Sequence, residues 1–255
     1  MLIDSHAHLN FNAFKDDLDK VIKRCRKEDL YVINVGSNYE TSKRAVEIAE
    51  KNDNMYAAIG LHPIHAKDEE FDVERYRELA KSPKVVAIGE IGIDYFKDYA
   101  LFKDKQKEVF LKQLSLAEEL NLPVIFHCRM AHEDLLDIIK ERDVKGVIHC
   151  FTGKWKEAEQ YLAKGLFLGI NGIMFKFDLE TVIKNVSLDN ILVETDCPYL
   201  TPLPAVALAK AGSQLRNEPI FVKYVVEEIA KLKNLSFDEV ASATVWNTRD
   251  LFGIE

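Results

Sequence analysis

The feature that most constrains the fold is an alternation, repeated along the chain, between short β-branched apolar runs and amphipathic stretches. Near-continuous apolar runs of this length are typical of parallel strands that are buried on both faces. Eight such runs occur, at residues 2–4, 31–35, 56–61, 85–90, 123–127, 146–149, 166–170 and 191–196. Helical periodicity occupies residues 14–28, 41–52, 101–120, 133–142 and 156–164, and the chain is again helical from 218 onward. Strands that alternate with helices in this order predict a parallel sheet.

The length of the chain decides between two parallel-sheet folds. At 255 residues, 47% of them hydrophobic, the chain can form a closed (β/α)8 TIM barrel as a single domain over residues 1–255. A doubly wound open sheet is the alternative, but the G-x-G-x-x-G turn that such sheets often carry is missing after the first strand. We therefore expect an α/β barrel of the TIM type.

Composition narrows the class of protein further. No stretch approaches the roughly 20 apolar residues of a membrane-spanning helix, and the N-terminus lacks the pattern of a secretory signal, so we expect a cytoplasmic protein with no membrane partner. The four cysteines have no C-x-x-C spacing and are expected to be reduced thiols. The formal net charge of −8 disfavours a broad surface that follows the phosphates of a duplex. A nucleic-acid substrate held locally by metal ions is still compatible with this charge, because the metals are not counted in it.

Polar side chains gather where the predicted strands end. His6 and His8 follow the first strand one residue apart, which places both imidazoles on the same face of an extended chain. Imidazole pairs of this kind commonly bind divalent transition metals. Six nitrogen and oxygen donors occupy such strand ends: His6, His8, Glu90, His127, His149 and Asp196. Because the carboxyl ends of all strands of a (β/α)8 barrel meet at one mouth, we expect these donors to converge there.

The composition of this donor set favours a catalytic metal centre over a structural one. Six donors suit two divalent cations that share a bridging carboxylate and keep positions open for water and substrate. A structural zinc site would more often use thiolates and fill its coordination shell. The spacing alone does not assign each donor to one cation, and nitrogen and oxygen ligands admit Mg, Mn or Zn.

Six short segments stand out in order along nearly the whole chain. They are D-S-H-A-H-L at 4–9, G-L-H-P at 60–63, G-E-I-G-I-D-Y at 89–95, H-C-F-T-G at 149–153, E-T-D-C-P-Y-L at 194–200 and R-N-E-P at 216–219. Together they resemble the TatD family of metal-dependent deoxyribonucleases, which belongs to the amidohydrolase-like barrels. The resemblance implies a (β/α)8 barrel that cleaves DNA ends as a 3′–5′ exonuclease, with RNA as a further substrate in some members.

The resemblance also implies two divalent cations. One would be held by His6, His8 and Asp196 and the other by His127 and His149, with Glu90 bridging the two. Glu90 and Asp196 are then the catalytic carboxylates. Asp196 is predicted to be both a ligand and the general base that takes a proton from the attacking water, because a carboxylate has two oxygens. A ligand with no role in proton transfer is the alternative.

Four further side chains are predicted to bind the substrate: His62, Arg129, Arg216 and Asn217. Arg129 lies two residues after a predicted ligand and so points the same way, where its guanidinium would either clamp a phosphate or pair with Asp94 or Glu194. His62 is expected to contact the substrate or to support the metal centre, rather than to bind a cation. Arg216 and Asn217 resemble the family's loop on the substrate side.

The segment before Arg216 departs from the family pattern. Family members usually run from the Pro-Tyr-Leu segment into a short loop with several basic residues. Residues 201–215 are here longer and largely apolar, with Lys210 as the one basic residue. The 203–215 loop is therefore atypical, and the resemblance says less about the substrate than about the metal centre.

Three functions fit these observations. The first is a metal-dependent 3′–5′ DNA exonuclease that also accepts RNA ends. The second is a small-molecule amide, ester or phosphoester hydrolase of the amidohydrolase superfamily; many of these bridge their metals with a carbamylated lysine, whereas Glu90 occupies that place here. The third is a binding scaffold without turnover. The complete set of six donors argues against this third function. The sequence names no protein partner.

Overall fold

Eight parallel strands form a barrel in the computed structural model, which describes residues 1–202 and 216–254. The strands are β1 (Leu2–Ala7), β2 (Leu30–Val35), β3 (Met55–Ile59), β4 (Val85–Asp94), β5 (Val124–Arg129), β6 (Gly146–Ile148), β7 (Phe167–Ile170) and β8 (Ile191–Val193). Each strand pairs with the next in sequence order. The ring closes where Ala7 forms a parallel bridge with Cys197, which follows β8. This confirms the (β/α)8 barrel that the strand–helix alternation predicts.

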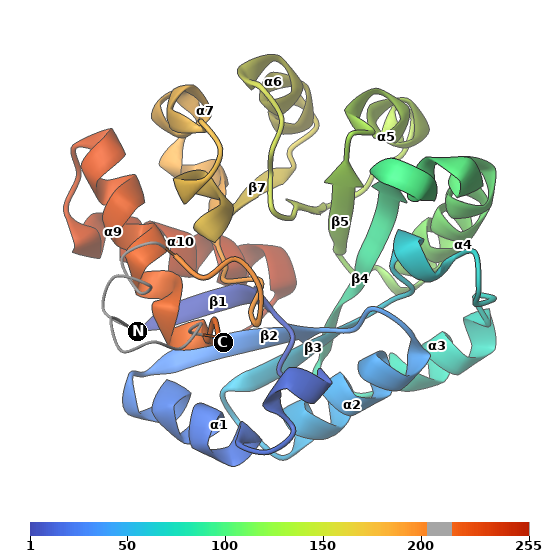
Figure 1. The fold of residues 1–255 in the computed structure, drawn as a ribbon, viewed down its shortest axis with the longest axis horizontal. Coiled ribbons are helices and arrows are strands. Elements are labelled where there is room, and N and C mark those ends of the chain that lie inside the picture. Colours follow the sequence, from blue (N-terminus) through green and yellow to red (C-terminus); the bar gives the residue numbers. More distant parts are fainter. Residues whose placement is uncertain (203–215, 255) are drawn as a thin grey trace.

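Helices surround the barrel on its outside (Figure 1). They are α1 (Leu18–Lys27), α2 (Tyr39–Glu50), α3 (Val73–Leu79), α4 (Lys103–Leu120), α5 (His132–Ile139), α6 (Trp155–Ala163), α7 (Glu180–Asn185), α9 (Val222–Lys233) and α10 (Phe237–Phe252). α2 begins at a capping box, in which the Asn38 side chain accepts a hydrogen bond from Thr41 N. α10 begins in the same way at Ser236 and Glu239. These polar residues satisfy backbone N–H groups that the first turn of a helix leaves unpaired.

Two strands differ from the expected lengths, and both differences affect the site. β4 extends to Asp94, four residues past the expected end, because it continues to pair with β5 as far as Arg129. β8 ends at Val193, so Asp196 lies in the segment that follows the strand. In that segment the Thr195 N–H donates to the carboxylate of Asp4 rather than to a neighbouring strand.

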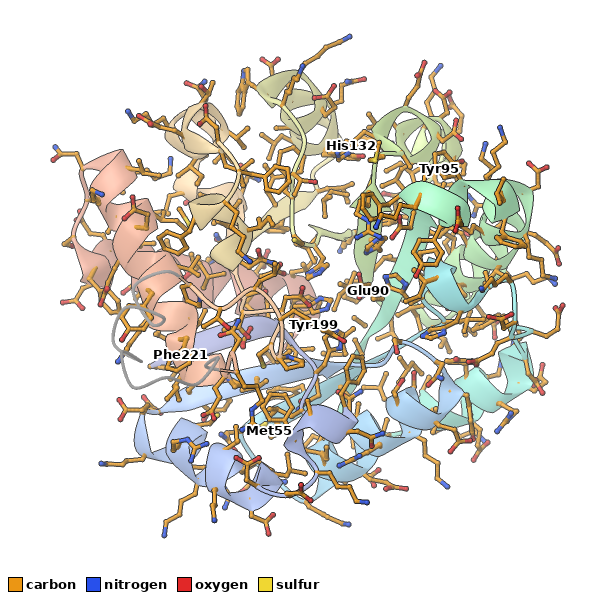
Figure 2. The ribbon with its side chains drawn as sticks, viewed as in Figure 1. Met55, Glu90, Tyr95, His132, Tyr199 and Phe221 are labelled. Carbon is orange, nitrogen blue, oxygen red and sulfur yellow. The ribbon has the colours of Figure 1, made fainter. Side chains whose placement is uncertain are left out.

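The apolar core has two parts. One cluster draws residues from strands all around the ring, including Ile3, Ile33 and Leu192, and therefore fills the barrel interior. Phe252 at the end of α10 also belongs to this cluster. The larger cluster contains buried residues of both the strands and the helices and packs the two layers together. Glu90 lies near the centre of the ring (Figure 2).

Three expectations from the sequence concern features outside the barrel itself. All four cysteines are free thiols, as their spacing predicts. Among the helices that the structure describes, none is both long and apolar enough to cross a bilayer. The atypical 203–215 loop lies outside the described residues.

Candidate metal centre

The end of β1 places two histidines side by side at the mouth of the barrel. The pairing of β1 with β2 shifts register between Asp4 and Ala7, and such a bulge re-aims the side chains near it. The Nε2 atoms of His6 and His8 lie 3.2 Å apart. Two imidazole nitrogens at about 2.1 Å from one shared cation would stand about 3.0–3.4 Å from each other. The spacing of this pair therefore fits a single cation between the two rings.

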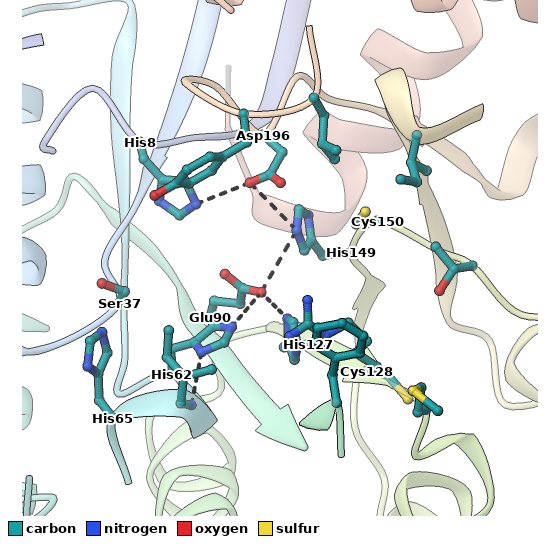
Figure 3. A pocket seen from close by; sticks show the side chains of 18 of the residues that line it. His8, Ser37, His62, His65, Glu90, His127, Cys128, His149, Cys150 and Asp196 are labelled. Atoms are coloured by element: carbon teal, nitrogen blue, oxygen red, sulfur yellow. Dashed lines mark hydrogen bonds and ion pairs between the residues drawn. The ribbon is translucent and has the colours of Figure 1, made fainter. Parts of the chain in front are cut away.

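Glu90 lies between two groups of histidines on the floor of the mouth (Figure 3). It also stands at a register shift, between Gly89 and Ile91 in the pairing of β4 with β5. One oxygen, Oε2, is 3.5 Å from His6 Nε2. The other, Oε1, is 2.6 Å from His127 Nδ1 and 3.8 Å from His149 Nε2. Because each carboxylate oxygen faces a different group, Glu90 has the geometry of a bridging ligand.

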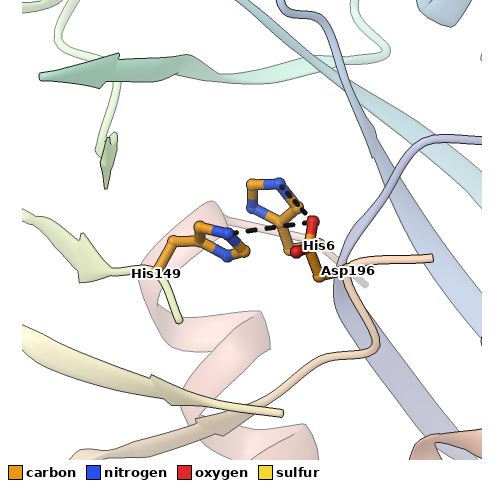
Figure 4. A group of neighbouring side chains, drawn as sticks. All are labelled: His6, His149 and Asp196. Carbon is orange, nitrogen blue, oxygen red and sulfur yellow. Dashed lines mark ion pairs between the residues drawn. The ribbon is translucent and has the colours of Figure 1, made fainter. Parts of the chain in front are cut away.

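Asp196 completes the group of donors around His6 (Figure 4). Its Oδ1 lies 3.3 Å from His8 Nε2 and 3.9 Å from the Nε2 atoms of both His6 and His149. Asp196 has a φ of +55°, a left-handed conformation that an aspartate adopts more readily than most residues. The donor atoms of His6, His149 and Asp196 all lie within 4.8 Å of one another, as do those of His6, His8 and Glu90. The six donors predicted from the sequence are thus all brought together.

The electrostatics of the cluster favour positive charge at its centre. Burial alone raises the pKa of Glu90, but the surrounding histidines, His62 and His149 first among them, hold it well below its usual range. Burial opposes the charged form of His149, but Glu194 and Glu90 outweigh it and raise its pKa to about 10. The same balance, set by Asp94 and Glu90, raises the pKa of His127. Ionised carboxylates that stabilise cationic histidines would equally stabilise divalent cations.

The second ring nitrogen of three histidines lies beside an oxygen outside the cluster, in a hydrogen bond for His8 and His127 and in an ion pair for His149. These contacts are His8 Nδ1 to Val35 O at 2.8 Å, His127 Nε2 to Asp94 Oδ2 at 3.1 Å, and His149 Nδ1 to Glu194 Oε1 at 2.8 Å. Such partners fix the orientation of the ring and direct the lone pair of the other nitrogen toward the centre.

Glu194 is itself tightly held, although its backbone lies just beyond β8. Its side chain is fully buried and accepts hydrogen bonds from Cys150 N and Asn171 Nδ2, both at 2.8 Å. Gly169 on β7 leaves the room that this carboxylate needs, because a Cβ there would stand 2.6 Å from Glu194 Oε2. Gly169 therefore helps to position His149, because it leaves room for the Glu194 carboxylate that contacts this ring.

His62 has the geometry of a hydrogen-bond donor. Its Nδ1 accepts a hydrogen bond from Ile64 N at 3.1 Å, so the neutral ring carries its proton on Nε2. That nitrogen lies 3.3 Å from Glu90 Oε1. Burial lowers the pKa of His62 to about 4, which keeps the ring neutral near pH 7. A protonated Nε2 cannot bind a cation, although the ring lies beside Glu90 and His127.

Arg129 lies at the edge of the mouth and pairs with Asp94. Its Nε and terminal nitrogen are 3.1 and 2.9 Å from the two Asp94 oxygens, and the guanidinium lies over the Phe96 ring. Of the two arrangements left open by the sequence, the ion pair with Asp94 is therefore present. The side chain is still 43% exposed and lines the cavity, so one face of the guanidinium is accessible.

Arg216 and Asn217 do not face the cavity in this structure. Arg216 forms a bidentate pair with Asp17, at 2.9 and 2.7 Å. Asn217 is fully buried, and its Nδ2 donates to Thr195 O and Tyr199 O at 2.9 and 2.5 Å. These contacts hold the segment that carries Asp196 in place. The substrate contact predicted for Arg216 and Asn217 stays a prediction.

Asp4 is a supporting residue to which the sequence analysis assigned no role. It is fully buried, and its two oxygens accept hydrogen bonds from Thr195 N at 2.8 Å and Thr195 Oγ1 at 2.5 Å. Burial raises its pKa to about 8. Asp4 thereby ties the strand that carries His6 to the loop that carries Asp196. Its place at the start of the first motif is the one signal in the sequence that points to it.

The metal centre forms the floor of a cavity of about 880 Å³. Its walls are largely apolar and aromatic: Phe11, Phe96, Met130, Ile173, Phe177 and Tyr199. Cavities of this size bind small molecules or single units of a polymer.

Comparison with known protein families agrees with this geometry. Residues 3–253 match the family model described as TatD related DNase. The chain belongs to the TatD related DNase family. This confirms the resemblance carried by the six sequence motifs.

Several relatives cover the whole chain. The Bacillus subtilis protein named "Uncharacterized metal-dependent hydrolase YabD" is 45% identical over 100% of both chains. The Erwinia amylovora protein named "3′-5′ ssDNA/RNA exonuclease TatD" is 36% identical over 99% of this chain and 100% of its own. Among solved structures, YJJV, a TatD homologue from Escherichia coli, superposes with a TM-score of 0.90 at 29% identity, covering 100% of this chain and 98% of that chain.

Proposed function

We propose that this TatD-family chain is a metal-dependent hydrolase that removes nucleotides from the 3′ ends of single-stranded DNA and RNA. The Erwinia relative with exonuclease in its name supports the choice of substrate. The observation that carries the proposal is the position of Glu90, whose two oxygens face two groups of histidines on the floor of the cavity. Phosphodiester hydrolysis is a reaction typical of two cations held in this way.

The proposed assignment of ligands is the one that the resemblance to the TatD family implies. His149 Nε2 stands about equally far from Glu90 Oε1, at 3.8 Å, and from Asp196 Oδ1, at 3.9 Å. His6, His8 and Asp196 would hold one divalent cation, His127 and His149 the second, and Glu90 would bridge the two. Bound there, Mg²⁺, Mn²⁺ or Zn²⁺ would bring the pKa of a water molecule toward neutrality and offset the charge that builds on the phosphoryl oxygens.

Asp196 is suited to accept the proton of the attacking water. Its three histidine contacts are made by Oδ1, which leaves the second oxygen to act as the base. Burial alone raises the pKa of Asp196, but the hydrogen bond from His8 and the charge of His149 lower it below its usual value. The carboxylate is therefore ionised when the water approaches.

Two other side chains would position the substrate. His62 Nε2–H, which points to the centre beside Glu90, would donate to a phosphoryl oxygen that enters the mouth. The exposed face of Arg129 would meet a phosphate while Asp94 holds the guanidinium in place.

The test is digestion of end-labelled oligonucleotides by the purified protein with Mg²⁺, Mn²⁺ or Zn²⁺. We expect single-stranded DNA and RNA to be shortened from the 3′ end. Glu90→Gln should lower the rate by about 1000-fold, because it removes the charge shared by both cations. Glu159→Gln on the exposed surface of α6 is the matched control and should keep full activity. Intact oligonucleotides with all three metals, in samples of measured metal content, would overturn the proposal.

A small-molecule hydrolase is the second candidate, because the apolar wall formed by Phe96, Ile173 and Phe177 would also suit an uncharged substrate. Turnover of an amide, ester or phosphoester in a screen, with no digestion of oligonucleotides, would select it. A scaffold role would require bound metal well below one ion per chain after reconstitution. The cytoplasmic location stays a prediction, which imaging of the tagged protein tests.

A further inference from the structure

A second groove opens beside the cavity and continues from it. It has a volume of about 540 Å³ and lies between the loop after β1, the first turns of α2 and residues 198–199. Phe11, Ser37, His65 and Tyr199 line both the groove and the main cavity. In Figure 3, Ser37 and His65 lie on the same side of the metal centre as His8. A polymer bound at the centre could therefore extend directly into the groove.

Arg44 on α2 gives the groove a positive charge with no partner. Within the part of the chain that the structure describes, its guanidinium forms no ion pair or hydrogen bond, whereas Arg129 pairs with Asp94. Glu40 is the one carboxylate among the groove's described lining residues, and it lies 3.8 Å from Arg75. An unpaired guanidinium in a concave site is suited to bind a phosphate.

Asn10 supplies an acceptor with no partner in the same groove. Its side chain is 1% exposed, and its Nδ2 donates to Val35 O and Thr41 O at 3.0 and 2.9 Å. Its Oδ1 is buried and has no hydrogen-bond partner among the described residues. A buried acceptor without a donor is unfavourable, and an N–H or O–H group, from an ordered water or from an occupant of the groove, would satisfy it. Nucleobases and sugar hydroxyls both offer such a group.

The two compartments differ in chemistry, and this sets the direction of the strand. The side of the main cavity formed by Phe96, Met130 and Phe177 is apolar and suits the base of the terminal nucleotide. The groove instead offers a cation and a polar acceptor. We infer that the groove binds the nucleotide on the 5′ side of the scissile bond, with Arg44 holding the phosphate 5′ to that nucleotide. Phe11 and Tyr199 stand at the junction and offer stacking surfaces to a base. This inference rests on the proposed function.

Two dinucleotides isolate the contact to Arg44. One has only the scissile phosphate, and the other adds a 5′-phosphate, which is the group that Arg44 would bind. We expect wild-type protein to prefer the 5′-phosphorylated substrate by about tenfold in kcat/KM, a typical effect of one charge-assisted hydrogen bond. In Arg44→Ala this ratio should fall to about one, and Arg44→Lys should restore most of it. Lys43→Ala removes the same charge from an exposed position on the same helix and should keep the wild-type ratio.

A binding measurement supplies a readout that is independent of turnover. Fluorescence anisotropy of a labelled single-stranded oligonucleotide, in EDTA and over a series of salt concentrations, gives the salt slope of the affinity. Arg44→Ala should reduce that slope by about 0.7, the value for one phosphate contact on a single strand, and Lys43→Ala should not. If wild type cleaves oligonucleotides but Arg44→Ala and Lys43→Ala behave alike, the groove is not this subsite and the proposed function stands. If wild type cleaves no oligonucleotide, the proposed function itself is wrong.

Discussion

Gly169→Ala tests whether the proposed metal centre depends on the position of a carboxylate that binds no metal. A Cβ at residue 169 would lie 2.6 Å from Glu194 Oε2, whereas ordinary contact begins near 3.4 Å. The carboxylate must therefore recede by about 0.8 Å. A shift of the whole carboxylate along the line of its 2.8 Å ion pair with His149 Nδ1 would lengthen that ion pair to at most about 3.6 Å and weaken it. Loss of such a supporting contact typically weakens metal binding by about 10- to 100-fold, or about 1.4–2.7 kcal/mol.

Isothermal titration with Mn²⁺ or Zn²⁺ measures this effect, and circular dichroism verifies the fold of each variant. We expect one of the two binding events to weaken, namely the one that uses His149. Gly165→Ala is the control, because its added methyl meets no atom within 4 Å and its φ of +75° costs only stability, about 1–2 kcal/mol. Unchanged affinity at both sites in a folded Gly169→Ala protein would refute the role given to Glu194.

Three further predictions address other parts of the site. His62→Ala should lower kcat by about 100-fold with unchanged metal content, because His62 donates a hydrogen bond to the substrate and no lone pair to a cation. His127→Ala should lose metal, and equal metal loss in both variants would contradict this distinction. Asp4→Ala should lower stability by about 1–3 kcal/mol, seen as a fall in Tm of about 2–10 °C, because the buried N–H and hydroxyl of Thr195 would both lose their partner. An unchanged Tm would contradict this role of Asp4. Removal of the cations by a chelator should abolish activity and lower Tm, because the cations bind only the folded state. Added metal should restore both, and activity that survives exhaustive chelation would exclude a metal-dependent reaction.

The elements that the sequence predicted well are those whose signal is local. The sequence predicted the eight strands and the long helices because the buried positions of each element form a pattern within a short stretch of the chain. α3 and α7 were missed, since seven and six residues are too few to show a helical period. The end of β8 was misplaced because Thr195 donates to Asp4, a residue 191 positions away.

The candidate site also combines features that local sequence signals predicted and features that depend on long-range contacts. Strand ends carrying His, Glu and Asp were visible in the sequence, and the barrel brings all six donors to one mouth, as its symmetry requires. The sequence left Arg129 open between a phosphate contact and an ion pair, and it did not predict the partner of Arg216, because a guanidinium pairs with whichever carboxylate the fold brings nearest. Arg129 pairs with Asp94, which it meets across the β4–β5 ladder. Arg216 pairs with Asp17, which is 199 residues away.

The amino-acid sequence by itself determined the class of fold, the family and the set of candidate ligands, because each depends on which residues stand at the ends of short apolar runs. Only the tertiary structure decided which ring nitrogen of each histidine faces the centre and that Glu90 lies between two groups of donors. It also decided that, among the described residues, the Arg44 guanidinium and the Asn10 Oδ1 have no partner. These properties depend on contacts between residues far apart in the chain. Local patterns constrain such contacts only through the fold that they build.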